Sequence, residues 1–408
     1  MVSSYPKDKI KVLLLEGIHQ NAIKTFQDAG YTNIELLSGA LPESELIEKI
    51  KDVSIVGIRS KTQLNERVLT AAKKLWGVSC FCIGTNQVDL KTAAKQGKVV
   101  FNSPYSNTRS VAELVIADVI FLMRGIPQKN AAAHQKIWLK SASNSNEVRG
   151  KTLGIIGYGH IGTQVSVLAE SIGMKVIYHD IIPKLPMGNA QSVDSLEQLM
   201  NQSDVVSLHV PATPETKYMI GEKELAMMQK GKYLINLSRG NIVDIDALKS
   251  ALESKHVLGA AVDVFPAEPK TNNDAFYSPL QGLTNVILTP HIGGSTLEAQ
   301  ENIGTDAALK LVNYLDNGST VGSHSVPDIH LPKQEGTHRI LHIHENVPGV
   351  MTAINNIMSR EGINIVGQYL KTNEDVGYVV LDVRGNVSTE IISELKSLPQ
   401  TIKSRVLY

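Results

Sequence analysis

A glycine-rich turn between a predicted strand and a predicted helix constrains this chain more than any other feature. Residues 157–162 read Gly-Tyr-Gly-His-Ile-Gly and follow directly on an apolar run at 153–156 that predicts a buried strand. From Ile161 onward, apolar residues recur on one face of a helical pattern. G-x-G-x-x-G in this context predicts the first turn of a dinucleotide-binding Rossmann fold. The alternative, a chance glycine turn, does not explain the strand before it and the helix after it.

The three glycines of this turn each meet a separate physical need. Gly157 permits a tight turn, Gly159 lets a pyrophosphate approach the backbone, and Gly162 lets the helix pack closely on the strand. The N-terminus of the helix then presents amide donors and a partial positive charge to the phosphates. Asp180 ends the next predicted strand, 18 residues after Gly162. A carboxylate there accepts the two ribose hydroxyls of NAD and repels the additional phosphate of NADP, so the sequence predicts NAD as the cofactor.

The alternation of strands and helices extends over most of the chain. With 408 residues it is too long for one compact core, and two or three domains are expected. Continuous apolar strands separated by helices predict parallel sheets that are covered on both faces. The first series has strands at 11–15, 33–37, 54–58 and 98–101, with helices at 21–29 and 43–51. The second has strands at 152–156, 175–178, 205–210, 233–237, 259–264 and 286–288, as a doubly wound dinucleotide domain needs.

The C-terminal part has a different pattern. Long helices are expected at 110–124 and 296–315, and the polar stretch 140–149 predicts a loop. Residues 319–336, which include two prolines, predict a loose linker. After the linker we expect strand 339–344, helix 348–360, strands 364–370 and 377–383, helix 389–398 and strand 401–407. This βαββαβ order is that of a ferredoxin-like fold.

Charge and cysteine content exclude several classes of function. Forty basic and forty acidic side chains cancel, which argues against a dedicated nucleic-acid partner. The most apolar helical stretch is too short to span a bilayer, and the polar N-terminus does not resemble a signal peptide, so we expect no membrane partner and a cytoplasmic protein. The two cysteines, Cys80 and Cys82, are interpreted as buried apolar residues, and no metal site is predicted.

Three polar residues follow predicted strands of the dinucleotide domain, at the edge where such sheets bind ligands. Arg239 follows strand 233–237, Glu268 lies just past strand 259–264, and His291 follows strand 286–288. An arginine suits a substrate carboxylate, and a histidine suits proton transfer at a hydroxyl that becomes a carbonyl. A carboxylate beside the histidine would fix its tautomer. Taken singly, each could instead be a solvated strand-end residue.

The motifs around these residues resemble the signatures of the D-isomer-specific 2-hydroxyacid dehydrogenase family. They are residues 236–240 (Asn-Leu-Ser-Arg-Gly), 263–268 and 289–294 (Thr-Pro-His-Ile-Gly-Gly). The resemblance covers essentially the whole chain, and three further segments are similar to the bacterial and fungal members that oxidise 3-phosphoglycerate: 81–90, 107–115 and 342–346. It implies an NAD-dependent first step of L-serine biosynthesis and a C-terminal ACT domain that binds serine as an allosteric effector.

The resemblance also implies residue roles. Arg239 would bind the substrate carboxylate, Glu268 would orient His291, and His291 would be the acid/base. Family cofactor contacts would fall on Gly157, Gly159, His160, Ile161, Gly162, Asp180, Leu237, Ser238, Arg239, Asp263, His291, Ile292, Gly293 and Gly294. Further substrate contacts would come from Arg59, Ser60 and Asn107, a cation, a hydroxyl and an amide that suit a phosphate or carboxylate. A solvated strand end is the alternative for Arg59, because Lys61 follows it.

The effector site implied for serine consists of His344, Asn346 and Asn364, the last contributed across an interface. Independently of the resemblance, His342 and His344 alternate with apolar residues, as in a strand with one polar face. Half a site at an edge strand needs a second copy, so a homo-oligomer is expected, either a dimer or a tetramer. Relatives often carry a glycine pair at the linker, where this chain has Glu335-Gly336. If that joint is a hinge, the strength of serine inhibition is in doubt.

The predicted architecture is α/β with three parts. A flavodoxin-like substrate domain (1–106 and 295–330) receives an inserted Rossmann-type NAD domain (107–294), and a ferredoxin-like ACT domain (337–408) follows. Two rival functions remain. One is a sister enzyme acting on another 2-hydroxy acid such as D-2-hydroxyglutarate, and a side reduction of 2-oxoglutarate to 2-hydroxyglutarate is a related expectation. The other is a non-catalytic NAD-sensing protein on the same fold.

Overall fold

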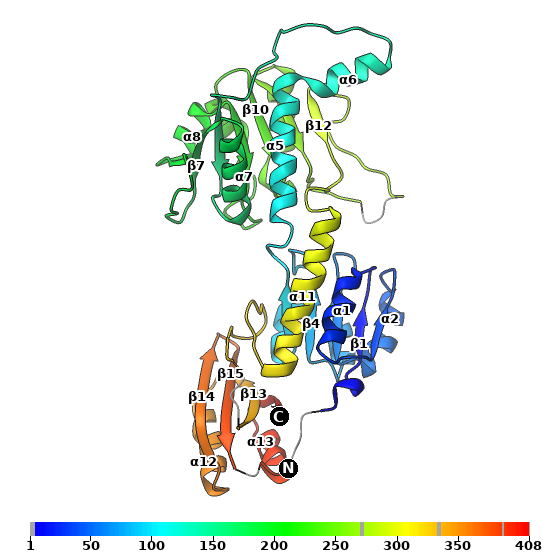
Figure 1. Cartoon of the computed structure of the whole chain (residues 1–408), viewed down its shortest axis with the longest axis vertical. Coiled ribbons are helices and arrows are strands. Elements are labelled where there is room, and N and C mark those ends of the chain that lie inside the picture. The colour runs from blue at the N-terminus through cyan, green and yellow to red at the C-terminus, as the bar shows by residue number, and fades with distance from the viewer. Residues whose placement is uncertain (1–4, 270–272, 333–335, 386, 408) are drawn as a thin grey trace. The chain divides into compact units, whose positions relative to one another are not determined.

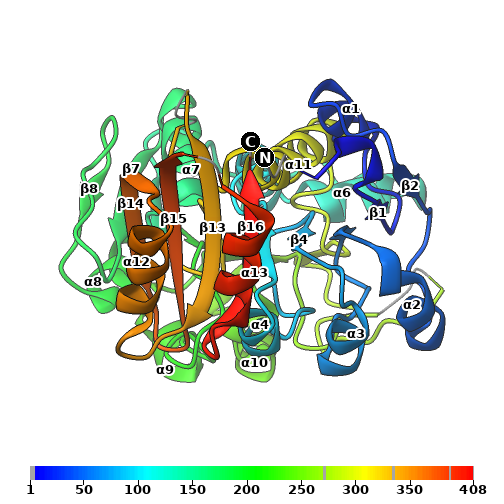
Figure 2. The same ribbon diagram turned by 90° about the horizontal axis from the view of Figure 1, so that it is seen from below.

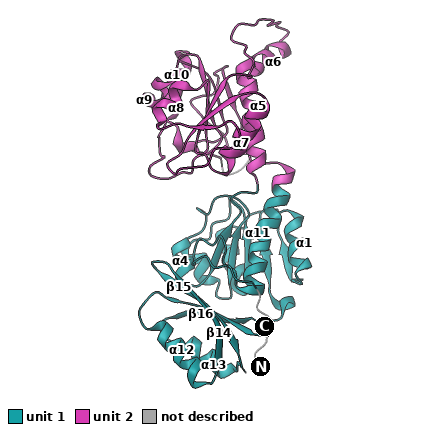
Figure 3. Cartoon of the chain, turned by 60° about the vertical axis from the view of Figure 1, so that its left-hand side comes forward, with its two compact units in different colours: residues 1–106, 300–408 teal, residues 107–299 magenta. Residues whose placement is uncertain are grey.

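The structure, a computed structural model, describes residues 5–269, 273–332, 336–385 and 387–407. The chain divides into two compact units, shown in Figure 3: unit 1 is residues 1–106 with 300–408, and unit 2 is residues 107–299. The boundaries between the units fall between residues 106 and 107 and, inside a long helix, between residues 299 and 300. Within the described residues, no helix combines the length and the apolar character needed to cross a membrane.

Unit 1 begins with a five-stranded parallel sheet. Its order is β2 (Ile34–Leu36), β1 (Val12–Leu14), β3 (Ile55–Ile58), β4 (Gly77–Cys80), β5 (Val99–Asn102). This is the flavodoxin-like order. Helices α1 (Gln20–Asp28), α2 (Glu43–Lys49), α3 (Glu66–Ala71), α4 (Leu90–Lys95) and the long α11 (Leu297–Asn317) accompany it (Figure 1). Strands β1, β3, β4 and β5 are buried because apolar side chains line both of their faces, and the edge strand β2 is half-buried. Strand β4 is the one strand here that has no counterpart in the expected series.

Unit 2 contains a seven-stranded parallel sheet. Its order is β12 (Val286–Leu288), β11 (Val257–Val262), β10 (Lys232–Asn236), β9 (Val205–Leu208), β6 (Thr152–Ile156), β7 (Lys175–His179), β8 (Gln191–Ser192). The six expected strands are confirmed, and β8 was missed. The helices are α5 (Thr108–Arg124), α6 (Ile126–His134), α7 (His160–Ser171), α8 (Leu196–Gln202), α9 (Glu222–Met227) and α10 (Ile245–Glu253). The order in which successive strands are added reverses between β6 and β9, the place where such sheets bind dinucleotides.

Unit 1 ends with a four-stranded antiparallel sheet, the C-terminal sheet. Figure 2 shows its order, β14 (Asn364–Thr372), β15 (Val376–Arg384), β13 (His338–Glu345), β16 (Thr401–Leu407). Helices α12 (Val350–Arg360) and α13 (Thr389–Ser397) pack on one face through Ile340 and Val379. The expected βαββαβ fold is confirmed. The other face, with Leu341 and Tyr378, belongs to the same apolar core as β1, β5 and α11.

The prediction of a loose linker at 319–336 is wrong for its described residues 319–332. His324 donates its amide to Val100 O at 2.8 Å, and Ser325 Oγ bonds both Val100 N at 2.9 Å and Lys98 O at 2.8 Å. Val326 is buried as well. His324 and Ser325 of this segment thus bond the free edge of β5, so the segment belongs to the fold. Glu335 of the expected hinge lies outside the described residues.

A buried ion pair fastens the C-terminal sheet to the end of α11. Arg339 and Asp382 are each 1% exposed, and Nε and Nη2 of the arginine lie 2.7 Å from the two carboxylate oxygens. Arg339 also donates to Asn317 O and Pro332 O, each at 2.9 Å. The C-terminal sheet thus belongs to the same compact unit as the first sheet.

Candidate active site

The glycine turn between β6 and α7 has the geometry that a dinucleotide requires. Gly157 has φ +90°, and a Cβ there would lie 2.5 Å from His209 O. A Cβ on Gly162 would lie 2.2 Å from Gly157 O, so the helix can approach the strand only because this residue is glycine. Around Gly159 no atom lies within 4 Å of such a Cβ. Space is therefore open at the one glycine that a pyrophosphate must approach, and the residues fit NAD.

Asp180 is held at the end of β7 by backbone amides. One carboxylate oxygen accepts from Tyr158 N at 2.8 Å and the other from Ile182 N at 3.0 Å. Tyr158 lies inside the glycine turn, so the carboxylate and the phosphate-binding backbone are fixed together. As the N-cap of α7, Gly159 has no side chain that could bond the amides of the first turn. Those amides suit a phosphate, and Asp180 suits ribose hydroxyls.

The three expected catalytic residues follow three neighbouring strands, β10, β11 and β12, at one edge of the sheet. His291 Nδ1 lies 2.8 Å from Glu268 Oε2, and Glu268 Oε1 accepts from Phe265 N at 3.1 Å. The hydrogen bond with Glu268 raises the pKa of His291, although burial opposes the shift. Burial alone would raise the pKa of Glu268, but the bond to His291 and the amide of Phe265 hold it below its usual value. The pair therefore favours a carboxylate beside a proton-carrying imidazole.

Arg239 reaches this pair because two loops pass each other at van der Waals distance. A Cβ on Gly240 would lie 2.0 Å from the Phe265 carbonyl carbon, so only glycine allows the loop after β10 to approach the loop that carries Glu268. Arg239 Nη1 donates to Ser238 O at 2.7 Å. The positive charge of Arg239 lowers the pKa of both Glu268 and His291, which places the guanidinium in their electrostatic neighbourhood. A cation there can bind a substrate carboxylate.

The turn that carries His291 is organised by Asp263, which is 1% exposed. Its carboxylate accepts from Thr289 Oγ1 at 2.6 Å and from Ile292 N and Gly293 N, both at 2.8 Å. His291 itself has φ +54°, a left-handed conformation that is unfavourable for a histidine. Such strain persists only where the surroundings impose it, and here Asp263 supplies the bonds that do so.

Asn107 lies against the same turn. It precedes α5, and its amide nitrogen would be 2.2 Å from a Cβ on Gly294. Its Oδ1 is buried and has no hydrogen-bond partner among the described residues. The structure thus brings Asn107 together with the catalytic turn and leaves an acceptor available to a ligand.

Arg59 and Ser60 belong to unit 1, at the end of β3. Their backbone is held by Glu16, whose carboxylate accepts from Arg59 N at 3.1 Å, Lys61 N at 2.9 Å and Thr62 N at 2.8 Å. Ser60 is exposed and Arg59 is half-buried. The loop has a fixed backbone that presents a cation and a hydroxyl, as a phosphate site needs.

The expected effector residues lie on the C-terminal sheet. His342 and His344 are 0% and 3% exposed, so the polar face predicted for this strand is buried and not solvated. His342 Nε2 lies 2.8 Å from Thr401 Oγ1, and His344 Nδ1 lies 2.9 Å from Glu345 O. Asn346 donates to Asn373 O at 2.7 Å, and Asn364 starts the edge strand β14. In the described ranges no three histidine, cysteine or acidic side chains gather as metal ligands.

Comparisons with known proteins agree with this geometry. The family model for the NAD-binding domain of D-isomer-specific 2-hydroxyacid dehydrogenases matches residues 116–293. D-3-phosphoglycerate dehydrogenase of Escherichia coli is 56% identical over 99% of both chains. The chain belongs to the D-isomer-specific 2-hydroxyacid dehydrogenase family. The enzyme of the same name from Dictyostelium discoideum is 52% identical over 100% of this chain and 99% of its own.

Members of this family that have solved structures share the fold. A D-lactate dehydrogenase from Aquifex aeolicus, complexed with NAD and lactic acid, matches with a TM-score of 0.66 and 27% identity over 78% of this chain and all of its own. Residues 340–403 match an ACT domain of the kind found in the small subunit of AHAS. This chain is accordingly an NAD-dependent oxidoreductase with a C-terminal ACT domain.

Sequence reasoning missed three structural residues of the site. Glu16 organises the Arg59 loop, Asp263 organises the His291 turn, and Gly240 allows the loops of Arg239 and Glu268 to meet. Asp263 was expected to contact the cofactor, a role that remains a prediction beside its observed one. Only Gly240 carried a signal, because a glycine directly after a functional arginine indicates a close approach of backbone.

Proposed function

We propose that the chain oxidises 3-phospho-D-glycerate to 3-phosphohydroxypyruvate with NAD, the first step of L-serine biosynthesis. The observation that carries the proposal is the Glu268–His291 pair beside Arg239, on a chain whose full-length relatives are named for this enzyme. A non-catalytic NAD sensor would not need a histidine whose pKa is raised by a paired carboxylate. The tautomer and the strained backbone of His291 serve proton transfer, not nucleotide binding.

In the proposed reaction, His291 and Arg239 have separate tasks. Glu268 occupies Nδ1 of His291, so Nδ1 carries the hydrogen and the lone pair of Nε2 is available. During oxidation Nε2 accepts the proton of the substrate C2 hydroxyl, and the raised pKa of His291 favours that transfer. Bound NAD supplies the acceptor for the hydride that leaves C2. In the reverse direction the imidazolium returns its proton to the carbonyl oxygen, and Arg239 holds the carboxylate throughout.

Substrate selectivity is proposed to come from Arg59, Ser60 and Asn107. A phosphate carries more charge than a second carboxylate, so a loop with a cation, a hydroxyl and Lys61 beside them favours a phosphorylated 2-hydroxy acid. Asn107 contributes its unpartnered buried acceptor near the catalytic turn.

The test is an absorbance assay of NADH with four substrates in parallel. The forward arms are 3-phosphoglycerate and D-2-hydroxyglutarate, and the reverse arms are 3-phosphohydroxypyruvate and 2-oxoglutarate. We expect the largest kcat/KM for the phosphorylated pair, a smaller one for 2-oxoglutarate, and loss of the difference in Arg59→Ala. Preference for 2-hydroxyglutarate would make the chain the sister enzyme, and no turnover with any substrate would leave the NAD sensor.

We also propose that L-serine inhibits the enzyme at the ACT domain, through His344, Asn346 and Asn364. His344 Nε2 is buried without a hydrogen-bond partner among the described residues, and Asn346 is exposed beside it. An amino acid offers donors and acceptors that satisfy such groups. The experiment compares serine inhibition of the full chain with that of Asn346→Ala and Asn364→Ala. Removing the domain is unsuitable, because its sheet shares the apolar core of β1 and α11. Inhibition that is unchanged in both variants would place the effector elsewhere.

A homo-oligomer is part of the proposal, and each unit contributes a surface. On edge strand β14, Val366, Tyr369 and Leu370 are 37%, 42% and 42% exposed. In unit 2, Trp138 after α6 is 86% exposed and Leu139 is 51% exposed. Two distinct self-complementary surfaces on one chain produce a tetramer, and one produces a dimer. Light scattering on Trp138→Ser and on Tyr369→Lys distinguishes these outcomes, and a monomeric parent chain would refute both.

The proposal includes a cytoplasmic location. Cys80 and Cys82 are both free, and burial raises their pKa values, as expected of unreactive thiols in a reducing compartment. Fractionation of cells that express the full chain would check it.

A further inference from the structure

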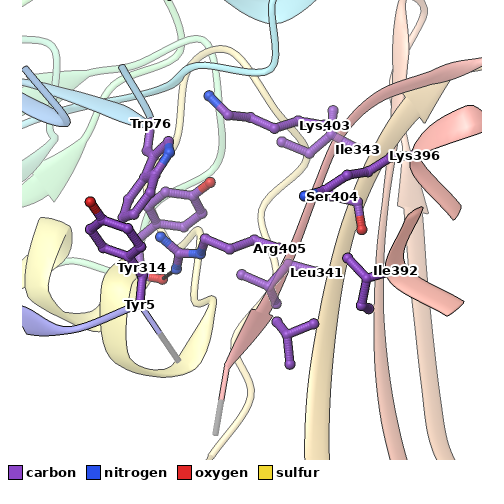
Figure 4. Close-up of a pocket in the computed structure, with 11 residues that line it drawn as sticks. Tyr5, Trp76, Tyr314, Leu341, Ile343, Ile392, Lys396, Lys403, Ser404 and Arg405 are labelled. Carbon is purple, nitrogen blue, oxygen red and sulfur yellow. Dashed lines mark hydrogen bonds between the residues drawn. The ribbon is translucent and has the colours of Figure 1, made fainter. Parts of the chain in front are cut away.

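A cavity of about 300 Å³ lies in unit 1 between the C-terminal sheet and the first sheet. From the C-terminal part it is lined by β13, β16 and α13, and from the first part by the N-terminal segment, the residue before β4, and α11. Its polar lining is cationic and its remaining walls are aromatic or aliphatic (Figure 4). The lining residues are Tyr5, Trp76, Tyr314, Leu341, Ile343, Ile392, Lys396, Lys403, Ser404, Arg405 and Val406.

Arg405 and Lys403 bring positive charge into this cavity from β16. The Arg405 guanidinium lies 4.8 Å from the ring centre of Trp76 and 5.0 Å from that of Tyr314, and Figure 4 shows it directed at these rings. Its Nη2 donates to Tyr314 O at 3.0 Å. Lys403 donates to Leu75 O at 2.6 Å. Strand β16 packs closely here, because a Cβ added at Gly97 would lie only 3.0 Å from Lys403 Cβ.

These cations face no opposite charge. In the ion pairs found among the described residues, Lys396, Lys403 and Arg405 take no part. Burial, together with the charges of Lys98 and Arg405, lowers the pKa of Lys403 to about 7. The geometry also shows that acceptors are lacking here. Two buried donors, Arg405 Nε and Ser404 Oγ, have no hydrogen-bond partner in the described part of the chain. Buried donors normally have partners, and clustered cations normally have an anion.

We propose that this cavity binds a small dianionic metabolite, an organic phosphate or a dicarboxylate with a short carbon chain. Lys403 and Arg405 would bind one anionic group on one face of β16, and Ser404 with the exposed Lys396 would bind the second on the other face. The aliphatic wall of Leu341, Ile343 and Val406 accommodates the carbon chain. A cavity of this size is at the lower end for small-molecule sites, which excludes a nucleotide or a long chain.

The site shares none of its lining residues with the proposed serine residues His344, Asn346 and Asn364. Asn364 lies on β14 and the cavity lies on β16, and these two strands are the opposite edges of the C-terminal sheet. Because its lining comes from the C-terminal sheet with α13 and from Tyr5, Trp76 and Tyr314 of the first part, a bound anion would hold these two parts of unit 1 together. The proposal does not depend on the dehydrogenase reaction and survives if the substrate assignment fails.

Trp76 makes a local test possible, since the chain has two tryptophans and only this one lines the cavity. The full chain with Trp138→Phe is titrated with inorganic phosphate and with succinate, with chloride at equal ionic strength as the reference. We expect a saturable change in Trp76 emission with phosphate or succinate and none with chloride. The anion that binds more tightly shows whether the site prefers a phosphate or a dicarboxylate.

Two variants in the same background decide where the anion binds. Lys403→Gln should weaken anion binding at least about tenfold, the scale of one lost bond to a charged group. Lys24→Gln, at an exposed position, serves as the matched control, and no change in affinity is expected for it. Ser404→Ala keeps every charge, should lose a few-fold in affinity, and remains informative if Lys403→Gln does not fold. No saturable response to either anion, or a response that both variants leave intact, would overturn the proposal.

Discussion

Two hydrogen-bonded ion pairs, one in each unit, show how exposure sets the task of a charged pair. In unit 2, the side chains of His291 and Glu268 are 51% and 35% exposed, and their contact is 2.8 Å. In unit 1, Arg339 and Asp382 are each 1% exposed, and their contacts are 2.7 Å. The first pair can exchange a proton with a ligand, because one of its members titrates and both are accessible. The second pair cannot exchange a proton with a ligand, because it is buried. Its arginine also donates to two backbone carbonyls.

The difference predicts opposite consequences for removal. Loss of a member of the exposed pair removes chemistry and leaves the surrounding strands in place, since the turn at His291 is held by Asp263. Loss of a member of the buried pair leaves an uncompensated charge inside the fold, which costs several kcal/mol. The predictions below test this division, beginning with the largest effect.

His291→Ala should reduce kcat by about 10²–10⁴-fold, the usual scale for a lost acid/base group, while NADH still binds. The thermal midpoint should move little, because Asp263 and not the imidazole organises the turn. Steady-state kinetics, NADH titration and a melting curve measure the three quantities. A variant that keeps near-normal turnover would show that another group transfers the proton.

Arg339→Ala should lower the free energy of unfolding of unit 1 by about 3–5 kcal/mol, since Asp382 is left buried without its partner. Catalytic constants at low temperature should change far less. Arg360→Ala is the matched control, because Arg360 is 59% exposed in its pair with Glu394 on the same ACT domain. The denaturation midpoints of the two variants are compared, and equal midpoints would contradict the role assigned to burial. The double change Arg339→Met with Asp382→Leu should recover part of the loss.

The two pairs also differ in how well the sequence predicts them. His291 and Glu268 were identified because each follows a strand at the ligand edge of a sheet whose glycine turn is diagnostic. Arg339 and Asp382 carry no such signal: they meet across two antiparallel strands, β13 and β15, and only the register brings them together. The same limit explains why Glu16 and the role of Asp263 in organising the His291 turn were missed, since each acts through bonds to backbone amides distant in sequence.

Element prediction failed where tertiary contacts decide the structure. Most strands and helices were located to within a residue or two because their apolar periodicity is local. Strand β8 has two residues, too few for any pattern. The segment 319–332 has the composition of a linker but is ordered by its bonds to the edge of β5, which no local pattern shows.

Asp180→Ala should weaken NAD binding roughly 10–100-fold, the loss of hydrogen bonds to a charged acceptor. This carboxylate extends the comparison, because it accepts hydrogen bonds from two backbone amides and its proposed functional partner is the ligand. Discrimination against NADP should relax, since the negative charge that repels the 2′-phosphate is gone. Cofactor titrations with NADH and NADPH measure both effects. Unchanged preference would mean that another residue reads the ribose.

Glu268→Gln should shift the pH dependence of oxidation, and the sign follows from the charges. Oxidation needs neutral His291, so kcat falls as the pH drops below the pKa of His291. The hydrogen bond to Glu268 raises that pKa, while burial and the charge of Arg239 lower it. An uncharged glutamine removes the largest raising effect and leaves only the smaller one from the charge of Asp263, so the acidic limb should move to lower pH. The reduction needs the imidazolium, so its basic limb should move in the same direction. Glu253→Gln, an exposed carboxylate on α10, should move neither limb. Because both limbs report one imidazole, a shift of one without the other would show that the accessible pair does not act as a unit, and the contrast with the buried pair would then rest on stability alone.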